Sequence, residues 1–194
     1  MSPATSTQRT VRVLRCLFLS TLCLVMQTSA SAQATFHRLG VLDDAPTGNY
    51  YSFSSGVSDN GKVVTGLSGD AFHDWPFRWT IESGMELLRP LPPTSQYVLS
   101  QAISADGSVI VGGSQGEGPG VFRWTEATGL ESLGAIGLAY AVSSNGDVIA
   151  GEADGRAFRW TENTGFVSIG EQGSIARGMS PDGSIVVGRT ESDE

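Results

Sequence analysis

An eleven-residue pattern recurs four times in this chain and constrains its fold more than any other feature. Each copy contains a serine, an Asn-Gly or Asp-Gly dipeptide, a run rich in β-branched residues and a closing glycine. The copies are residues 56–66, 102–112, 141–151 and 178–188. Self-similarity at a period of about forty residues is typical of repeat proteins, in which each unit packs on its neighbours. We therefore predict a repeat fold in which the residues common to all units have mostly structural roles.

Each copy is predicted to form a β-hairpin. Its Asn-Gly or Asp-Gly dipeptide tolerates the positive φ that both central residues of a type I′ turn require. The serine two residues before the dipeptide can bond to the turn backbone, and the closing glycine indicates a bulge or the close approach of another backbone. The turn residues with this structural role are Asn60, Gly61, Asp106, Gly107, Asn145, Gly146, Asp182 and Gly183.

A second motif, Phe-Arg-Trp-Thr, follows the first three copies at residues 77–80, 122–125 and 158–161. Its alternation predicts a strand whose aromatic pair faces a core and whose arginine faces the opposite layer. A glutamate follows each arginine within four positions, so we expect an ion pair or stacking on a neighbouring tryptophan. A line of arginines could also bind an anionic glycan, but recurrence favours structure. The residues assigned to this role are Arg78, Trp79, Arg123, Trp124, Arg159 and Trp160.

The two motifs together predict an all-β fold of the β-propeller type. A Thr-x-x-x-Gly turn leads from the second motif into another apolar strand, which gives four short antiparallel strands per unit, as in a propeller blade. The predicted units span about residues 50–96, 97–136, 137–173 and, incompletely, 174–194. Residues 36–42 resemble the last strand of a unit and are expected to form a strand that closes the ring. The alternatives are a β-solenoid and a fragment of a longer array.

Residues 1–32 are predicted to be a signal peptide, which leaves residues 33–194 as the repeat domain. Three arginines precede the apolar run Cys16–Met26, and Ala30-Ser31-Ala32 supplies the small residues for cleavage after Ala32. The apolar run is shorter than the roughly 20 residues of a membrane-spanning helix. We therefore expect secretion by the general route to the periplasm or the cell exterior, with no membrane insertion after cleavage.

The composition of the exported chain argues against several classes of function. Both cysteines, Cys16 and Cys23, leave with the signal peptide, so no thiol remains for a disulfide, a zinc site or a nucleophile. The net charge of −8 becomes more negative without the three arginines, which argues against a nucleic-acid partner. No acidic turn has EF-hand spacing, and the two histidines, His37 and His73, lie in no hydrolase motif. We therefore predict no metal, no cofactor and no catalytic residue.

The chain resembles the probable extracellular repeat family named for a His-Ala-Phe triplet, the HAF repeats. The resemblance covers nearly all of residues 36–190 and rests on three motifs. These are the Ser-x-Asp/Asn-Gly hairpins, the Phe-Arg-Trp-Thr strands and the Gly-x-x-x-Leu/Ile-Gly segments near Gly129–Gly134 and Gly165–Gly170. The triplet itself is imperfect, since Arg156-Ala157-Phe158 keeps two of its three residues. The resemblance implies export and a repeated β fold, and it brings no established activity.

Function in repeat proteins is expected where the units differ. The first unit has additional residues, Phe72–Pro76, before its third strand, and His73, Asp74 and Trp75 among them are candidate contacts for a sugar or a peptide. We therefore predict an exported, non-catalytic module that binds a glycan or a protein. The alternatives are a propeller-fold carbohydrate-active enzyme, with carboxylates on one face of the ring, and an incomplete piece of a longer repeat array.

Overall fold

The computed structural model describes residues 34–42, 50–70, 72–92, 95–114 and 116–190. The predicted signal peptide lies outside these residues. The chain divides into two compact parts, Met1–Phe36 and His37–Glu194, and the architecture given below is that of the second part.

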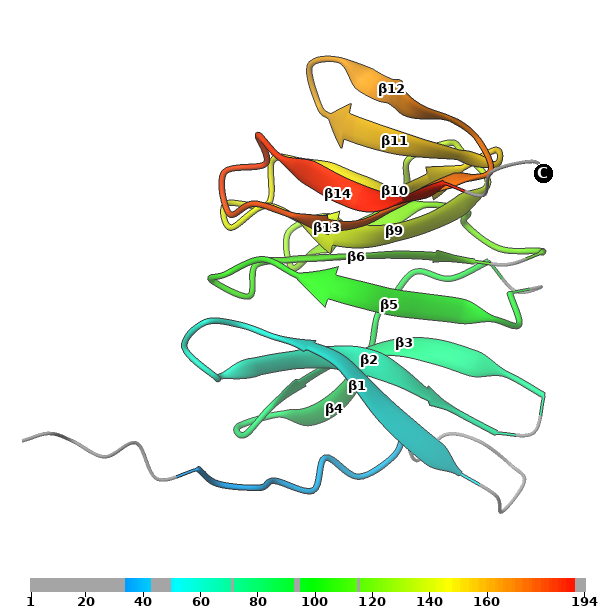
Figure 1. Cartoon of the computed structure of the whole chain (residues 1–194). Helices are drawn as coiled ribbons and strands as arrows, with labels where there is room; N and C mark the ends of the chain where they lie inside the picture. Colours follow the sequence, from blue (N-terminus) through cyan, green and yellow to red (C-terminus); the bar gives the residue numbers. More distant parts are fainter. Residues whose placement is uncertain (1–33, 43–49, 71, 93–94, 115, 191–194) are drawn as a thin grey trace, which may run out of the picture. The chain divides into compact units, whose positions relative to one another are not determined.

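The described residues form fourteen β-strands and no helix (Figure 1), which confirms the all-β prediction. The strands are β1 Tyr51–Val57, β2 Val63–Gly69, β3 Asp74–Thr80, β4 Gly84–Leu87, β5 Val98–Ile103, β6 Val109–Ser114, β7 Phe122–Thr125, β8 Gly129–Ser132, β9 Gly137–Val142, β10 Ile149–Ala153, β11 Arg156–Thr161, β12 Gly165–Gln172, β13 Ser174–Met179 and β14 Val186–Thr190.

The strands pair in the order of the chain. β1 to β4 form a four-stranded antiparallel sheet, the first unit, and the same succession recurs in β5 to β8 and β9 to β12, the second and third units. β13 and β14 form the hairpin of the fourth unit. The second and third units share one eight-stranded sheet, because β6 also pairs with β9 through Gly113 with Leu138 and Ser114 with Gly137.

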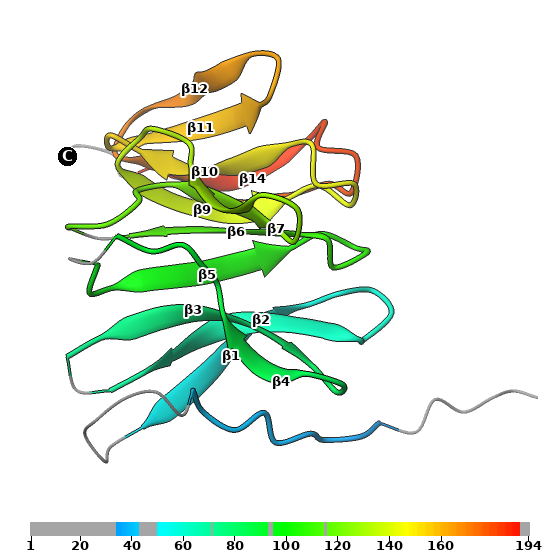
Figure 2. The same cartoon turned by 180° about the vertical axis from the view of Figure 1, so that it is seen from behind.

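Consecutive units pack on one another through their first strands. β5 lies against β1, β2 and β3 (Figures 1 and 2), and β13 lies against β9, β10 and β11 (Figure 1). One apolar cluster joins the first and second units, another joins the second and third units, and the alanines Ala150, Ala157 and Ala176 join the third and fourth units. Phe122 packs with Leu88 of the preceding unit, and Phe158 packs with Val111 and Val121 of the preceding unit. The phenylalanine of the second motif thus faces the core, as predicted, and joins one unit to the next.

The hairpin turns differ from the predicted type I′ geometry. Gly61, the second residue of the first dipeptide, has a φ of 70°, whereas Asp154 is the one described non-glycine residue with a positive φ. In the first turn the Gly61 N–H donates to the Ser58 carbonyl at 2.8 Å, and the Ser58 N–H donates to the Val63 carbonyl at 2.9 Å. The loop therefore needs one left-handed glycine. Asn60 stays at negative φ because its side chain accepts hydrogen bonds from the Ser58 hydroxyl at 2.8 Å and the Lys62 N–H at 2.9 Å.

The closing glycines lie against the backbone of the first strand, as predicted. A Cβ on Gly112 would lie 1.9 Å from the Leu99 carbonyl oxygen, and a Cβ on Gly66 would lie 1.9 Å from that of Phe53. The contact is so close because the first strand of every hairpin contains a bulge at this level. The additional residues of the four bulges are Ser55, Gln101, Tyr140 and Arg177.

Residues 36–42 form no strand, in contrast to the prediction. Residues 37–42 contact the first unit through single hydrogen bonds, from the Ser52 hydroxyl to the Gly40 carbonyl at 2.7 Å and from the Leu42 N–H to the Ser68 hydroxyl at 3.1 Å. The His37 ring also lies 6.4 Å from the Trp79 ring. The backbone groups of this segment bind serine side chains of the first unit instead of its backbone, so the segment forms no ladder.

Substitution of alanine for Gly112 is expected to lower the free energy of unfolding by about 1–3 kcal/mol, because the added methyl group would overlap the Leu99 carbonyl. The matched control is Gly178→Ala, since the equivalent residues of the second and third units are Ala102 and Ala141 and a Cβ on Gly178 would meet only the Val187 side chain, at 3.3 Å. Urea denaturation of both variants measures the difference. Equal stabilities would show that the close approach has no structural importance.

Candidate functional site

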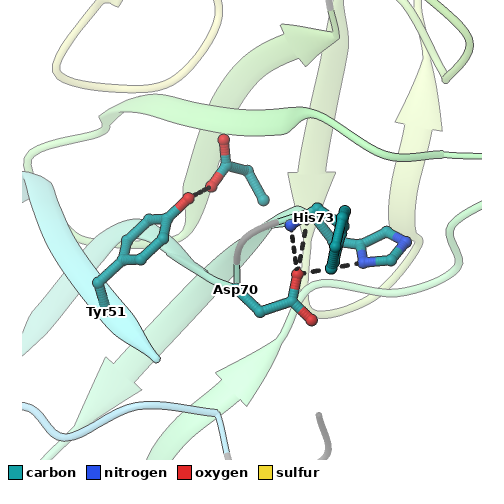
Figure 3. A network of polar contacts seen from close by, with 5 residues as sticks. Tyr51, Asp70 and His73 are labelled. Atoms are coloured by element: carbon teal, nitrogen blue, oxygen red, sulfur yellow. Dashed lines mark hydrogen bonds and ion pairs between the residues drawn. The ribbon is translucent and has the colours of Figure 1, made fainter. Parts of the chain in front are cut away.

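Asp70 organises the connection between β2 and β3 in the first unit (Figure 3). Its buried carboxylate accepts hydrogen bonds from the Phe72 N–H at 2.8 Å and the His73 N–H at 2.9 Å, and it lies 3.3 Å from His73 Nδ1. The Asp70 N–H also donates to the His73 carbonyl at 2.9 Å. Asp70 was not among the predicted site residues. Its signal is an aspartate just before a short connection, where its side chain can satisfy the turn backbone.

The His73 and Trp75 side chains stack on one another. Their ring centroids are 5.1 Å apart and their planes differ by 6°. The two residues are separated by one position, so they project from the same side of the extended backbone. Asp74, Trp75 and Pro76 belong to β3 itself, which begins at Asp74. The additional residues of the first unit thus lengthen a strand as well as a loop, and this places Trp75 on a rigid element.

Asp74 links three segments of the chain. Its Oδ1 accepts a hydrogen bond from the Tyr51 hydroxyl of β1 at 2.6 Å (Figure 3), and its N–H donates to the Gln96 carbonyl at 2.7 Å. The hydrogen bond to Asp74, together with burial and nearby carboxylates, raises the pKa of Tyr51 to about 12. Tyr51 therefore stays protonated at neutral pH and acts as a hydrogen-bond donor.

Two further aromatic residues, Phe53 and Tyr97, lie near this group. Tyr51 lies 5.6 Å from Phe53, ring to ring, and Tyr97 forms an isolated bridge with Asp74. Both Phe53 and Tyr97 are exposed. We name Tyr51, His73, Asp74, Trp75 and Tyr97 the unit-one cluster. All three predicted contacts, His73, Asp74 and Trp75, belong to it, and it has two sides: His73 and Trp75 stack on one side of the strand, while Asp74, the residue between them, projects from the opposite side with Tyr51.

The recurring arginines and tryptophans line grooves between the units. A groove of about 790 Å³ lies between the second and third units and contains Arg123, Glu131, Asp147 and Trp160. A similar groove of about 710 Å³ contains Arg78 of the first unit and Trp124 of the second. An arginine of one unit thus shares a groove with the tryptophan of the next unit, which gives the second candidate site.

The prediction that each arginine of the second motif pairs with the glutamate that follows it is wrong. Within the described residues, Glu82, Glu126 and Glu162 take part in no ion pair. Arg78 instead lies 3.6 Å from Glu86, the residue directly opposite it on β4, and Arg159 Nε donates to the Gly183 carbonyl of the next unit at 3.3 Å. Cross-strand position therefore decides the partner more than sequence proximity. The Arg78–Glu86 pair, in which Glu86 is exposed and Arg78 half-buried, contributes little to stability.

The carboxylates of the hairpin turns accept hydrogen bonds from serines of the same turn. The Ser180 hydroxyl donates to Asp182 at 2.6 Å, and this bond, together with those from Ser184, lowers the pKa of Asp182 to about 2. The Ser104 hydroxyl likewise donates to Asp106 at 2.7 Å and lowers its pKa. In the described part of the chain, His, Cys, Asp and Glu side chains form no group of three or more that could hold a metal ion.

Comparison with known protein families and with curated proteins found no match to this sequence. The resemblance to HAF repeats therefore stays a prediction. None of the described segments is a helix long and apolar enough to span a membrane.

The turn carboxylates Asp106 and Asp182 are expected to make the free energy of unfolding depend on pH in the acid range. The folded pKa of each group lies below the ordinary value of 3.8, so its contribution to stability is present above that value and is lost as the pH falls through the lowered pKa, which is about 2 for Asp182. The variant Asp106→Asn/Asp182→Asn keeps the turns, because asparagine occupies the same position at Asn60 and Asn145. Its unfolding free energy, measured in urea, should fall less between about pH 5 and 2 than that of the native chain. An identical decrease would contradict this assignment.

Proposed function

We propose that this protein is an exported, non-catalytic binding module, built of propeller-type repeat units of the HAF kind, which holds a glycan at its unit-one cluster. The stacked His73–Trp75 pair is the observation that carries this proposal. The N-terminal sequence supports export, and the unit architecture supports a scaffold that presents a site where one unit differs from the others.

The strand arrangement favours blades of the propeller type. Each complete unit is a meander of four antiparallel strands, and the first strand of a unit packs on the preceding one. Such an array holds its units rigidly, because every interface buries apolar side chains such as Phe122 and Phe158. A rigid support lowers the entropy that a binding site loses when it takes up its ligand.

The chemistry of the unit-one cluster suits a sugar. A pyranose ring has a face of C–H groups that packs on aromatic rings, and hydroxyls that donate to carboxylates. His73 and Trp75 offer ring faces, and within the described residues Asp74 uses only Oδ1 for its hydrogen bond to Tyr51. The second carboxylate oxygen of Asp74 can accept a hydrogen bond on the opposite side of the strand, so the stacking surface for the sugar is that of His73 and Trp75 alone.

The carboxylates favour binding over catalysis. Glycoside cleavage needs a carboxylic acid with a raised pKa opposite a second carboxylate. Within the described residues the pKa values of Asp106 and Asp182 are lowered, the opposite of what a general acid needs, and both groups serve turns. Asp70 is buried and occupied by backbone N–H groups. Each of these acids therefore has a structural task.

A panel of immobilised bacterial and plant polysaccharides, probed with the purified protein, tests the proposal. Trp75→Ala should weaken binding to the recognised glycan by about tenfold or more, because the stacking surface is lost. The matched control is Trp160→Ala, which removes a tryptophan from the groove between the second and third units. Tyr51→Phe, which keeps the ring and removes the donor to Asp74, should weaken binding less than Trp75→Ala.

Three results would contradict the proposal. Absence of binding across the panel would remove the glycan as the ligand class. A loss of binding in Trp160→Ala but not in Trp75→Ala would move the site to the groove. Release of reducing sugar from a bound polysaccharide would show an enzyme.

A further inference from the structure

Neighbouring units are joined by a hydrogen bond between their hairpin turns. The Asp59 N–H donates to the Ala105 carbonyl at 2.8 Å, the Ala105 N–H donates to the Ser144 carbonyl at 3.1 Å, and the Ser144 N–H donates to the Pro181 carbonyl at 2.8 Å. These four residues occupy equivalent positions, directly after the serine of each hairpin. The turn of each unit therefore donates to the turn of the next unit, in one direction along the chain.

The same interfaces contain a recurring apolar contact. Gly107 packs on Val63, Gly146 packs on Val109 and Gly183 packs on Val148, so closely that a Cβ on any of these glycines would lie within 2.7 Å of the valine. Each glycine belongs to the turn of one unit, and each valine begins, or directly precedes, the second strand of the unit before it. The three valines are 8%, 3% and 7% exposed. A turn glycine and an aliphatic side chain thus fit together three times.

The fourth unit presents one half of this interface to solvent. Ile185 occupies the position of Val63, Val109 and Val148 but is 63% exposed. Val187 is 59% exposed, whereas the equivalent Thr65 is fully buried. We name Ile185 and Val187 the tail face.

The first unit presents the other half. Gly61 has open space around the position of its missing Cβ, unlike the three other turn glycines. Val57 is 58% exposed, whereas the equivalent Ile103 and Val142 pack on the apolar clusters. We name Val57 and Gly61 the head face. It carries the same residue types that cover the valines inside the chain.

From this complementarity we infer that a second copy of this chain docks head to tail, with the head face of one copy on the tail face of the other. The three internal interfaces show that the hairpin turn of another unit covers residues of the tail type, and the head face of a second copy is such a turn. In the docked pair Gly61 of one copy lies on Ile185 of the other. Such an interface is heterologous, because it joins two different patches.

Pro181 limits the strength of this interface. The residue in its position donates a hydrogen bond to the next turn in the other units, but proline has no N–H. The docked copy therefore gains the apolar contact without the turn-to-turn hydrogen bond. Pro181→Ala supplies the missing donor, as alanine does at Ala105, and should tighten association by roughly two- to tenfold.

Complementation between variants tests the head-to-tail arrangement. Ile185→Asp disables the tail face and Val57→Asp disables the head face, so each variant alone should be a monomer in sedimentation velocity, while the native protein associates with rising concentration. An equimolar mixture should form a one-to-one dimer, because it still contains one intact head and one intact tail. Ile136→Asp, which changes a side chain that is 72% exposed elsewhere, is the matched control and should associate like the native protein.

Two outcomes would overturn the inference. A native protein that stays monomeric at all concentrations would exclude docking of a second copy. An equimolar mixture of the two variants that stays monomeric would exclude a head-to-tail contact between copies. This result is expected if the head face and the tail face contact one another within a single chain. Circular dichroism verifies that the variants keep their strands, and Val187→Asp provides a second disabled tail if Ile185→Asp does not fold.

Discussion

The hydrogen-bonded serine turn is the interaction on which the rest of this structure depends. In the first unit the Ser58 hydroxyl donates to Asn60 at 2.8 Å and accepts from the Val63 N–H at 3.0 Å, and the same pair of bonds recurs in the other three units. This fixes the loop with one left-handed glycine. The next backbone N–H, that of Asp59, then points to the neighbouring unit. Local turn chemistry therefore sets the contact between units, and that contact repeats because the turn repeats.

Much of the fold could be predicted from the sequence because its signals are local and repeated. The hairpins, the strand alternation of Phe-Arg-Trp-Thr and the close contact at Gly112 all follow from residue types at short spacing. The type I′ turn could not be predicted correctly, because the dipeptide fits several loops and the Ser58–Asn60 hydrogen bond selects among them. The pairing of β6 with β9 depends on two strands that approach only in the folded chain.

The candidate site was predictable in position but not in construction. An aromatic next to a histidine and an acid, in the unit that differs from the others, indicated His73, Asp74 and Trp75. Their support could not be predicted, since the Tyr51 hydrogen bond joins residues 23 positions apart. Asp70 also escaped prediction, because one aspartate before a loop has no distinctive spacing. The residues that recur are explained by structure, and the unit-one cluster is where the chain departs from its own pattern.

The most direct test of the turn-centred account is amide hydrogen exchange at Asp59, Ala105 and Ser144, measured by NMR. In an isolated hairpin these N–H groups would face solvent, whereas here each donates to the next unit. The account predicts protection close to that of the central strands, lost only with global unfolding. Exchange of these three amides at the rate of an exposed loop would contradict it, since the units would then be held together without their turns.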